Sequence, residues 1–278
     1  MAFCLATSMS QTIIMSNISS KSVVFIAGAF VGNNCWDEWK IYFESKGYKC
    51  IAPPWPHKDA DPEELRNRHP DAAIASNRLT TLTDHFAGIV EALPEKPILI
   101  GHSVGGLIVQ LLLQLDLGAA GIAIHSFPPK GVVKFHFTFL KTVWGACDFF
   151  TSAKKTYLIS FRKWKHAITN GMTCDQQKQS YYKYAIPESR LVVKDTMTIG
   201  AKINFEKPHA PLLLTSGAND KLIPPSINYN NYKRYKKDIS ITHYKEFKGR
   251  NHFVLGQPTW IEDADFILYW LQGIKSNI

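Results

Sequence analysis

A short apolar run, a glycine-rich turn and a longer apolar stretch follow one another between residues 97 and 117. The run covers residues 97–100, the turn residues 101–106 and the longer stretch residues 107–117. A short apolar run between turn signals is typical of a buried strand, and a longer apolar stretch is typical of a buried helix. The segment therefore predicts a strand, a sharp turn and a helix, the repeating unit of sheets with parallel strands.

Other apolar segments of strand length alternate with segments of helical periodicity along the chain. The expected strands cover residues 22–27, 48–52, 97–100, 120–125, 210–216 and 239–247, and the expected helices include one that contains Trp36, Trp39 and Phe43, one that begins at Asp61, residues 78–93 and residues 261–271. This alternation predicts an α/β fold with an open, mainly parallel sheet flanked by helices. A chain of 278 residues is long enough to bury a sizeable core around such a sheet.

About 75 residues interrupt the alternation between two strands that would otherwise be neighbours. Residues 134–209 are rich in aromatic side chains at helix-compatible spacings, which predicts an inserted helical cap with an apolar underside. The core that contains the sheet would then comprise residues 21–133 and 210–278. Residues 1–20 are expected to be a flexible leader, with a plastid-type transit peptide as the alternative.

The turn after the strand at residues 97–100 has the pattern G-x-S-x-G, with Ser103 between Gly101 and Gly105. A serine at the junction of a strand and a helix is lifted above the edge of the sheet, where it can act as a nucleophile. Side chains at the two glycine positions would collide with the flanking strand or helix. We therefore expect Ser103 to be a catalytic nucleophile.

A serine hydroxyl needs a base to take its proton, and the base needs an acid to orient it. Asp220 follows the strand at residues 210–216, and His252 follows the strand that ends at Phe247. The carboxyl ends of parallel strands meet at one edge of a sheet, so the order Ser, Asp, His predicts a catalytic triad. Two backbone amides should stabilise the oxyanion, that of Val104 directly after the serine and that of Ala29 in the turn after the first strand.

These segments resemble the α/β-hydrolase superfamily, specifically the capped serine hydrolases of the esterase, lipase and non-heme haloperoxidase-like group. The matching segments are AGAFVGNNCWDEW at residues 27–39, GHSVGG at residues 101–106, GANDKLIPP at residues 217–225 and GRNHF at residues 249–253. The resemblance implies the α/β-hydrolase fold and the same five residue roles. It also directs attention to four positions as substrate contacts, namely Gly28, Phe30, Trp144 and Phe253.

The resemblance also bears on which reaction the predicted site catalyses. Haloalkane dehalogenases and epoxide hydrolases of this fold have an aspartate where Ser103 stands. Plant hydroxynitrile lyases have a threonine at the position of Gly28 and a lysine at the position of Phe253. Cofactor-free hydrolysis of small apolar carboxylic esters, with lactones or thioesters as variants, is therefore favoured. A lyase, a C–C hydrolase or a perhydrolase using the same triad, and a receptor without turnover, remain alternatives.

The formal charge of +9 first suggests an anionic partner. The excess lies within residues 134–250, which hold 21 basic and 8 acidic residues. No nucleic-acid-binding signature accompanies it, so we expect a solvated surface and no nucleic-acid partner. The same residues could attract acidic substrates at the rim of the cap.

Five scattered cysteines without a C-x-x-C pair predict no metal site and favour a reducing, cytoplasmic location. No apolar run is long enough to predict a membrane span. The sequence predicts no cofactor, and it contains no signal for a particular oligomeric state.

Overall fold

A computed structural model describes residues 18–132, 152 and 155–273. Six parallel strands form a single sheet in the order β2-β1-β3-β4-β5-β6. The strands are β1 (Ser22–Ile26), β2 (Lys49–Ile51), β3 (Ile98–His102), β4 (Ala120–Ile124), β5 (Leu212–Gly217) and β6 (Thr242–Phe247). The chain passes from β1 outward to β2 and then back to β3 on the other side of β1. In open α/β sheets, ligands bind beyond the carboxyl ends of the strands near such a reversal.

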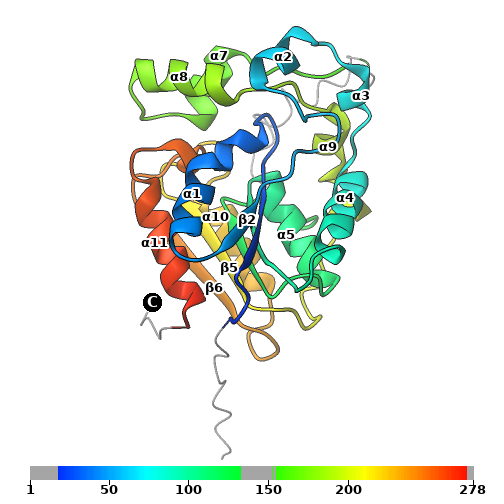
Figure 1. Cartoon of the computed structure of the whole chain (residues 1–278), viewed down its shortest axis with the longest axis vertical. Coiled ribbons are helices and arrows are strands. Elements are labelled where there is room, and N and C mark those ends of the chain that lie inside the picture. Colours follow the sequence, from blue (N-terminus) through cyan, green and yellow to red (C-terminus); the bar gives the residue numbers. More distant parts are fainter. Residues whose placement is uncertain (1–17, 133–151, 153–154, 274–278) are drawn as a thin grey trace, which may run out of the picture.

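Helices cover both faces of the sheet (Figure 1). One face carries α1 (Asp37–Ser45) and α11 (Trp260–Leu271), and the other carries α4 (Leu79–Glu91), α5 (Val104–Gln114) and α10 (Pro225–Arg234). The expected α/β fold with a mainly parallel sheet is confirmed.

Alternate residues of each strand enter different hydrophobic layers. Val24 and Ile26 pack with α4 and α5, whereas Val23 and Phe25 pack with α1 and α11. Successive side chains of a strand point to opposite faces, so an unbroken apolar strand indicates a sheet that is covered on both sides. The loops at the carboxyl edge thus extend from a sheet that is packed on both faces.

Sequence signals at element ends agree with the structure at most positions. Asp61 caps α2 (Pro62–Asn67) by accepting hydrogen bonds from the amides of Glu63 and Glu64, at 2.9 and 3.0 Å. The edge strand β2 is shorter than the expected residues 48–52, because only three of its residues pair with β1. The last strand begins at Thr242, three residues later than expected.

Described parts of the connection from β4 to β5 lie over the carboxyl edge of the sheet, where several of their residues line a cavity with Ser103. The described elements of this connection are α7 (Phe161–Lys163), a π-helical turn (Trp164–Ile168), α8 (Cys174–Tyr184), α9 (Arg190–Asp195) and a 3-10 turn (Ile199–Ala201). With α2 and α3 (Ala72–Ala75), helices α7 and α8 occupy the upper end of the molecule in Figure 1. Residues 133–151 and 153–154, which include Trp144, and residues 1–17 of the expected leader lie outside the described residues.

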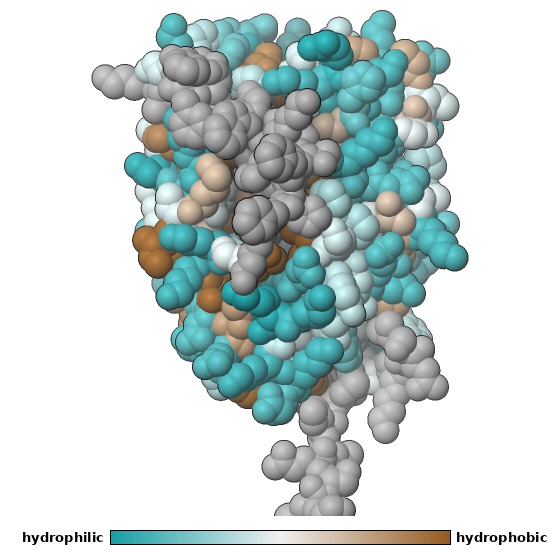
Figure 2. Space-filling model, turned by 180° about the vertical axis from the view of Figure 1, so that it is seen from behind, coloured by the Kyte–Doolittle hydropathy of each residue, from teal (hydrophilic) through white to brown (hydrophobic). Residues whose placement is uncertain are grey.

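The opposite view in Figure 2 shows a mostly hydrophilic surface on which hydrophobic residues form small, separate groups. In the described parts of the chain, no helix combines the length and apolar character that crossing a membrane requires.

Candidate active site

Ser103 stands at the turn between β3 and α5. Its backbone has φ +54°, a left-handed conformation that is costly for a residue with a side chain. A Cβ atom at Gly101 would lie 2.2 Å from the carbonyl oxygen of Gly105, and one at Gly105 would lie 2.2 Å from that of Ile26. Only glycine fits at either position, and together the two glycines allow the turn that presents Ser103.

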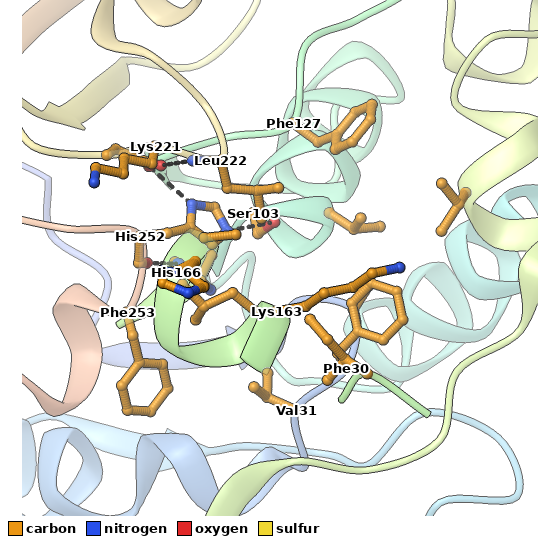
Figure 3. A pocket seen from close by; sticks show the side chains of 18 of the residues that line it. Phe30, Val31, Ser103, Phe127, Lys163, His166, Lys221, Leu222, His252 and Phe253 are labelled. Carbon is orange, nitrogen blue, oxygen red and sulfur yellow. Dashed lines mark hydrogen bonds and ion pairs between the residues drawn. The ribbon is translucent and has the colours of Figure 1, made fainter. Parts of the chain in front are cut away.

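The structure brings together the three residues that the sequence singled out at separate strand ends. The Nε2 atom of His252 lies 3.1 Å from the hydroxyl oxygen of Ser103, and its Nδ1 atom lies 2.8 Å from Oδ2 of Asp220 (Figure 3). All three side chains are buried. Both distances lie within the range of a nucleophile bonded to a base and a base bonded to an acid.

Asp220 is held as a carboxylate by its surroundings. Its Oδ1 atom accepts hydrogen bonds from the amides of Leu222 and Ile223, at 2.9 and 2.8 Å. Burial alone would raise the pKa of Asp220, but the charge of His252 and hydrogen bonds from the neighbouring imidazoles hold that pKa below its usual value. The ionised side chain can therefore orient His252 and stabilise its protonated form.

Two further histidines, which were not predicted from the sequence, lie beside Asp220 and His252. The Nδ1 atom of His125, at the end of β4, lies 3.2 Å from Oδ2 of Asp220, and His125 is fully buried with φ +45°. His102 donates a hydrogen bond from Nε2 to the carbonyl oxygen of His252, at 2.8 Å. Burial, followed by the charges of the other two imidazoles, lowers the pKa of His102 well below its usual range, so its ring is neutral.

Ligand atoms of His125, Asp220 and His252 all lie within 4.8 Å of one another, a grouping that could offer three ligands to a metal ion. Zinc ligands at about 2.0–2.2 Å from a tetrahedral ion are roughly 3.4 Å apart. The 2.8 Å separation between His252 and Asp220 is too short for two ligands of one ion and fits a direct hydrogen bond. These residues are therefore arranged to bond to each other.

The two residues whose amides the sequence predicts as oxyanion donors lie near Ser103. Ala29 lies in the turn after β1, Val104 is the first residue of α5, and both line the same cavity as Ser103. Within the described residues, no acceptor takes the N–H of either one. Residues that carry a hydroxyl, an imidazole, a carboxylate and two backbone amides without a described acceptor thus line one cavity. Amides that point at a developing oxyanion are what acyl-transfer chemistry requires.

The cavity above Ser103 has a volume of about 770 Å³. Most of its lining is apolar, from Phe30, Phe127, Ile159, Val193, Leu222 and Phe253. Three cationic side chains also line it, from Arg162, Lys163 and Lys221, and His166 lies among them. In the close-up view, Lys163 and Lys221 lie on opposite sides of Ser103 (Figure 3).

The expected substrate contacts fall in different places. Phe30 and Phe253 line the cavity, and the ring of Phe253 packs against Trp164 and Tyr184. Gly28 lies against Ser103, since a Cβ atom at Gly28 would be 3.0 Å from the Cβ of the serine. Gly28 is not among the residues that line the cavity. Trp144 lies outside the described residues.

Residues 23–264 match the model of the alpha/beta hydrolase family, so the chain belongs to that family. A curated relative, norfluorocurarine synthase 2 of Strychnos, is 30% identical over 107 residues, which are 37% of this chain and 36% of that protein. The chain thus matches only about a third of the length of this relative.

Solved structures show the same fold at low sequence identity. A methylesterase from Arabidopsis has a TM-score of 0.62 at 15% identity, covering 91% of this chain and 99% of its own. A monoacylglycerol lipase from Paleococcus ferrophilus has a TM-score of 0.64 at 20% identity, covering 91% and 94%. A pyrethroid hydrolase from Sphingobium faniae has a TM-score of 0.64 at 16% identity, covering 92% and 99%.

Proposed function

We propose that this hydrolase cleaves small apolar carboxylic esters through an acyl-enzyme formed on Ser103. The observation that carries the proposal is the continuous hydrogen-bonded series from Ser103 through His252 to Asp220 on the floor of the cavity. The names of the methylesterase and the lipase that share the fold are consistent with ester chemistry.

In this mechanism the Ser103 oxygen attacks the ester carbonyl while Nε2 of His252 takes its proton. The amides of Ala29 and Val104 stabilise the negative charge that forms on the carbonyl oxygen. His252 then gives the proton to the departing alkoxide, which leaves as the alcohol. A water molecule, deprotonated in turn by His252, attacks the acyl-enzyme and releases the carboxylic acid. Asp220 stays ionised throughout and stabilises the imidazolium.

The proposal assigns residues 134–209 the role of a cap that roofs the cavity, since Ile159, Arg162 and Val193 of this segment line it. The apolar lining would hold the acyl group, and the aromatic ring of Phe30 would lie beside the ester.

We further propose that the protein works in a reducing compartment. The three described cysteines, Cys35, Cys50 and Cys174, are free thiols. Burial raises the pKa of Cys50 to about 12 and raises that of Cys35 further, so both thiols stay protonated and unreactive.

The test of the ester hydrolase proposal is steady-state turnover of 4-nitrophenyl butyrate by the purified protein, with labelling by a fluorophosphonate probe in parallel. Both are expected. Turnover of a cyanohydrin or of acetate with peroxide in place of the ester would point to a lyase or a perhydrolase with the same residues. Binding of the ester without turnover would point to a receptor, and either result would refute the proposal.

The apolar lining predicts a preference for longer acyl groups. Each buried methylene group contributes about 0.8 kcal/mol, so kcat/KM should rise about fourfold per carbon from acetate to hexanoate. The measurement is a series of 4-nitrophenyl esters at one pH. A flat profile, or one that falls beyond acetate, would contradict a substrate-binding role for the apolar lining.

The basic side chains around the cavity predict a preference for esters with a carboxylate at the far end of the acyl chain. Asp220 is the sole acid among the described lining residues and is bonded to His252, so it leaves Arg162 and Lys221 unopposed there. Exposed charge pairs contribute about 0.2–1 kcal/mol each, so two of them should make KM for mono-4-nitrophenyl glutarate about two- to thirtyfold lower than KM for 4-nitrophenyl valerate.

This difference should shrink in 0.5 M NaCl and in the Arg162→Gln/Lys221→Gln variant, because salt screens exposed charges. Lys178→Gln, an exposed position on α8, is the matched control and should leave the ratio unchanged. Equal KM values for the two esters at low salt would rule out an electrostatic preference.

A further inference from the structure

The turn that carries Ala29 is held by a residue far away in the sequence. The N–H of Phe30 donates a hydrogen bond to Oε2 of Glu188, at 3.1 Å, and the carbonyl oxygen of Phe30 accepts one from the amide of Ile186, at 3.0 Å. Glu188 and Ile186 belong to the connection between β4 and β5, more than 150 residues beyond Phe30. Both hydrogen-bonding groups of the Phe30 backbone are therefore fixed by one strand-like segment of the connection.

Phe30 needs this support because its backbone is strained. Its φ is +68°, in the left-handed region, which is unfavourable for an aromatic residue. Such a conformation persists only where the surroundings impose it. Without the contact from Glu188, Phe30 would relax toward negative φ and the Ala29–Phe30 peptide would turn. Its movement would displace the neighbouring Gly28–Ala29 peptide, which carries the Ala29 N–H.

A carboxylate suits the position of Glu188 because two backbone amides point at its two oxygens. Oε2 accepts from Phe30, and Oε1 accepts from the amide of Ser189, at 2.7 Å. The side chain of Glu188 is fully buried. An apolar side chain there would leave both amides without an acceptor, and an amide side chain could accept from only one of them.

Lys58 neutralises this buried carboxylate. Its Nζ atom lies 2.6 Å from Oε2 of Glu188 and 4.1 Å from the centre of the Trp55 ring, and its side chain is 2% exposed. Lys58 follows β2, so the pair joins three segments, namely the turn after β1, the segment after β2 and the β4–β5 connection. A buried ion pair is costly to assemble and contributes little net stability, so stability alone does not account for the presence of this pair.

We infer that Glu188, balanced by Lys58, is a positioning residue that holds the Phe30 peptide so that the Ala29 amide stays aimed at the oxyanion. The inference rests on the proposed ester hydrolysis, because it assigns the pair an effect on the transition state of that reaction. Neither side chain lines the cavity, so the pair acts through the backbone of the turn.

Two double variants that differ by one acceptor test the inference. Lys58→Met/Glu188→Met removes the charges and the acceptor, whereas Lys58→Met/Glu188→Gln removes the charges and retains one oxygen for the Phe30 amide. Loss of one oxyanion donor costs about 10²–10³-fold in kcat. We expect the methionine variant to lose about 10²-fold in kcat with KM nearly unchanged, and the glutamine variant to recover most of that loss.

The readouts separate positioning from general loosening. Rates are referred to sites titrated with the fluorophosphonate probe, so a misfolded fraction does not count. Affinity for an alkyl boronic acid, whose tetrahedral adduct places an oxygen between the two amides, should fall in parallel with kcat. Affinity for the product carboxylate should not change.

Asp195→Asn is the matched control. The Asp195 carboxylate also ties the connection to the core, accepting from the Arg78 guanidinium at 2.6 Å and from the Leu79 amide at 3.2 Å. The hydrogen bonds described for this carboxylate go to Arg78 and Leu79 and not to the turn after β1, so this variant should lose thermal stability and keep kcat. Equal kcat values in the two double variants, whether high or low, would overturn the inference, and so would an equal loss in Asp195→Asn. Absence of ester turnover in the wild type would instead refute the proposed function itself.

Discussion

Replacement of Ser103 by alanine is expected to lower kcat for 4-nitrophenyl butyrate by about 10⁵-fold or more, because no other group can form the acyl-enzyme. His252 and Asp220 would remain in place, but the base would have no proton to take. The residual rate would come from the two amides and from binding alone. Single-turnover and steady-state rates, together with fluorophosphonate labelling and mass spectrometry of the intact protein, measure the effect.

Ser126→Ala serves as the control for this substitution. Ser126 is also a buried serine just beyond the end of a strand, but its hydroxyl bonds to Gln110 and to the carbonyl oxygen of Phe127. It should retain labelling and turnover. If Ser103→Ala kept more than about 1% of wild-type kcat, or were labelled as fast as the wild type, Ser103 would not be the nucleophile.

Local sequence patterns are sufficient to predict the sheet and the positions of the three main site residues. The apolar run at residues 97–100 and the glycines that follow it fix the turn at Ser103, since no other residue type fits beside Ile26 and the start of α5. Asp220 and His252 each follow a strand directly, and the carboxyl ends of parallel strands necessarily meet at one edge. Their approach to Ser103 is thus a consequence of topology.

The supporting residues could not be predicted in the same way. His125 follows the apolar run at residues 120–124, one strand from Ser103, so its place at a strand end was the available signal. Its contact with Asp220 depends on a left-handed backbone that no local pattern indicates. Glu188 and Lys58 meet across 130 residues in segments without periodicity, and such contacts are set by tertiary packing alone.

The positions of the basic residues in the fold give the net charge of the chain a more specific interpretation. The basic excess within residues 134–250 does not form a nucleic-acid signature, yet Arg162, Lys163 and Lys221 from this stretch line the cavity above Ser103. Composition therefore identified a segment that contributes basic side chains to the lining of the cavity. It could not show that three of these side chains share one opening.

Asp220→Asn is expected to lower kcat by about 10⁴-fold, an effect nearly as large as that of removing the nucleophile. An amide in place of the carboxylate can present an N–H to Nδ1 of His252, which would favour the tautomer with its proton on Nε2. His252 could then no longer accept the proton of Ser103. The charge that stabilises the imidazolium would also be lost. Measurement of kcat and KM with 4-nitrophenyl butyrate should show the loss almost entirely in kcat.

The same substitution should change how stability depends on pH. The pKa of Asp220 in the folded protein lies below its usual value of 3.8, so the folded carboxylate binds protons less readily than the unfolded one. Its contribution to the free energy of unfolding is therefore fully present above about pH 4 and is lost as the pH falls toward the folded pKa. Urea unfolding from pH 7 to pH 3 should show the wild type losing its advantage over Asp220→Asn in that acidic range.

Asp238→Asn is the appropriate comparison for both measurements, because Asp238 is exposed and lies outside the cavity. It should keep wild-type kcat and follow the wild-type pH profile of stability. A stability difference between wild type and Asp220→Asn that stays constant, or grows, below pH 4 would mean that the Asp220 carboxylate is not held in its charged form. Since only the charged form can stabilise the imidazolium of His252, that result would remove the acid from the proposed mechanism and leave Ser103 and His252 to act as a pair.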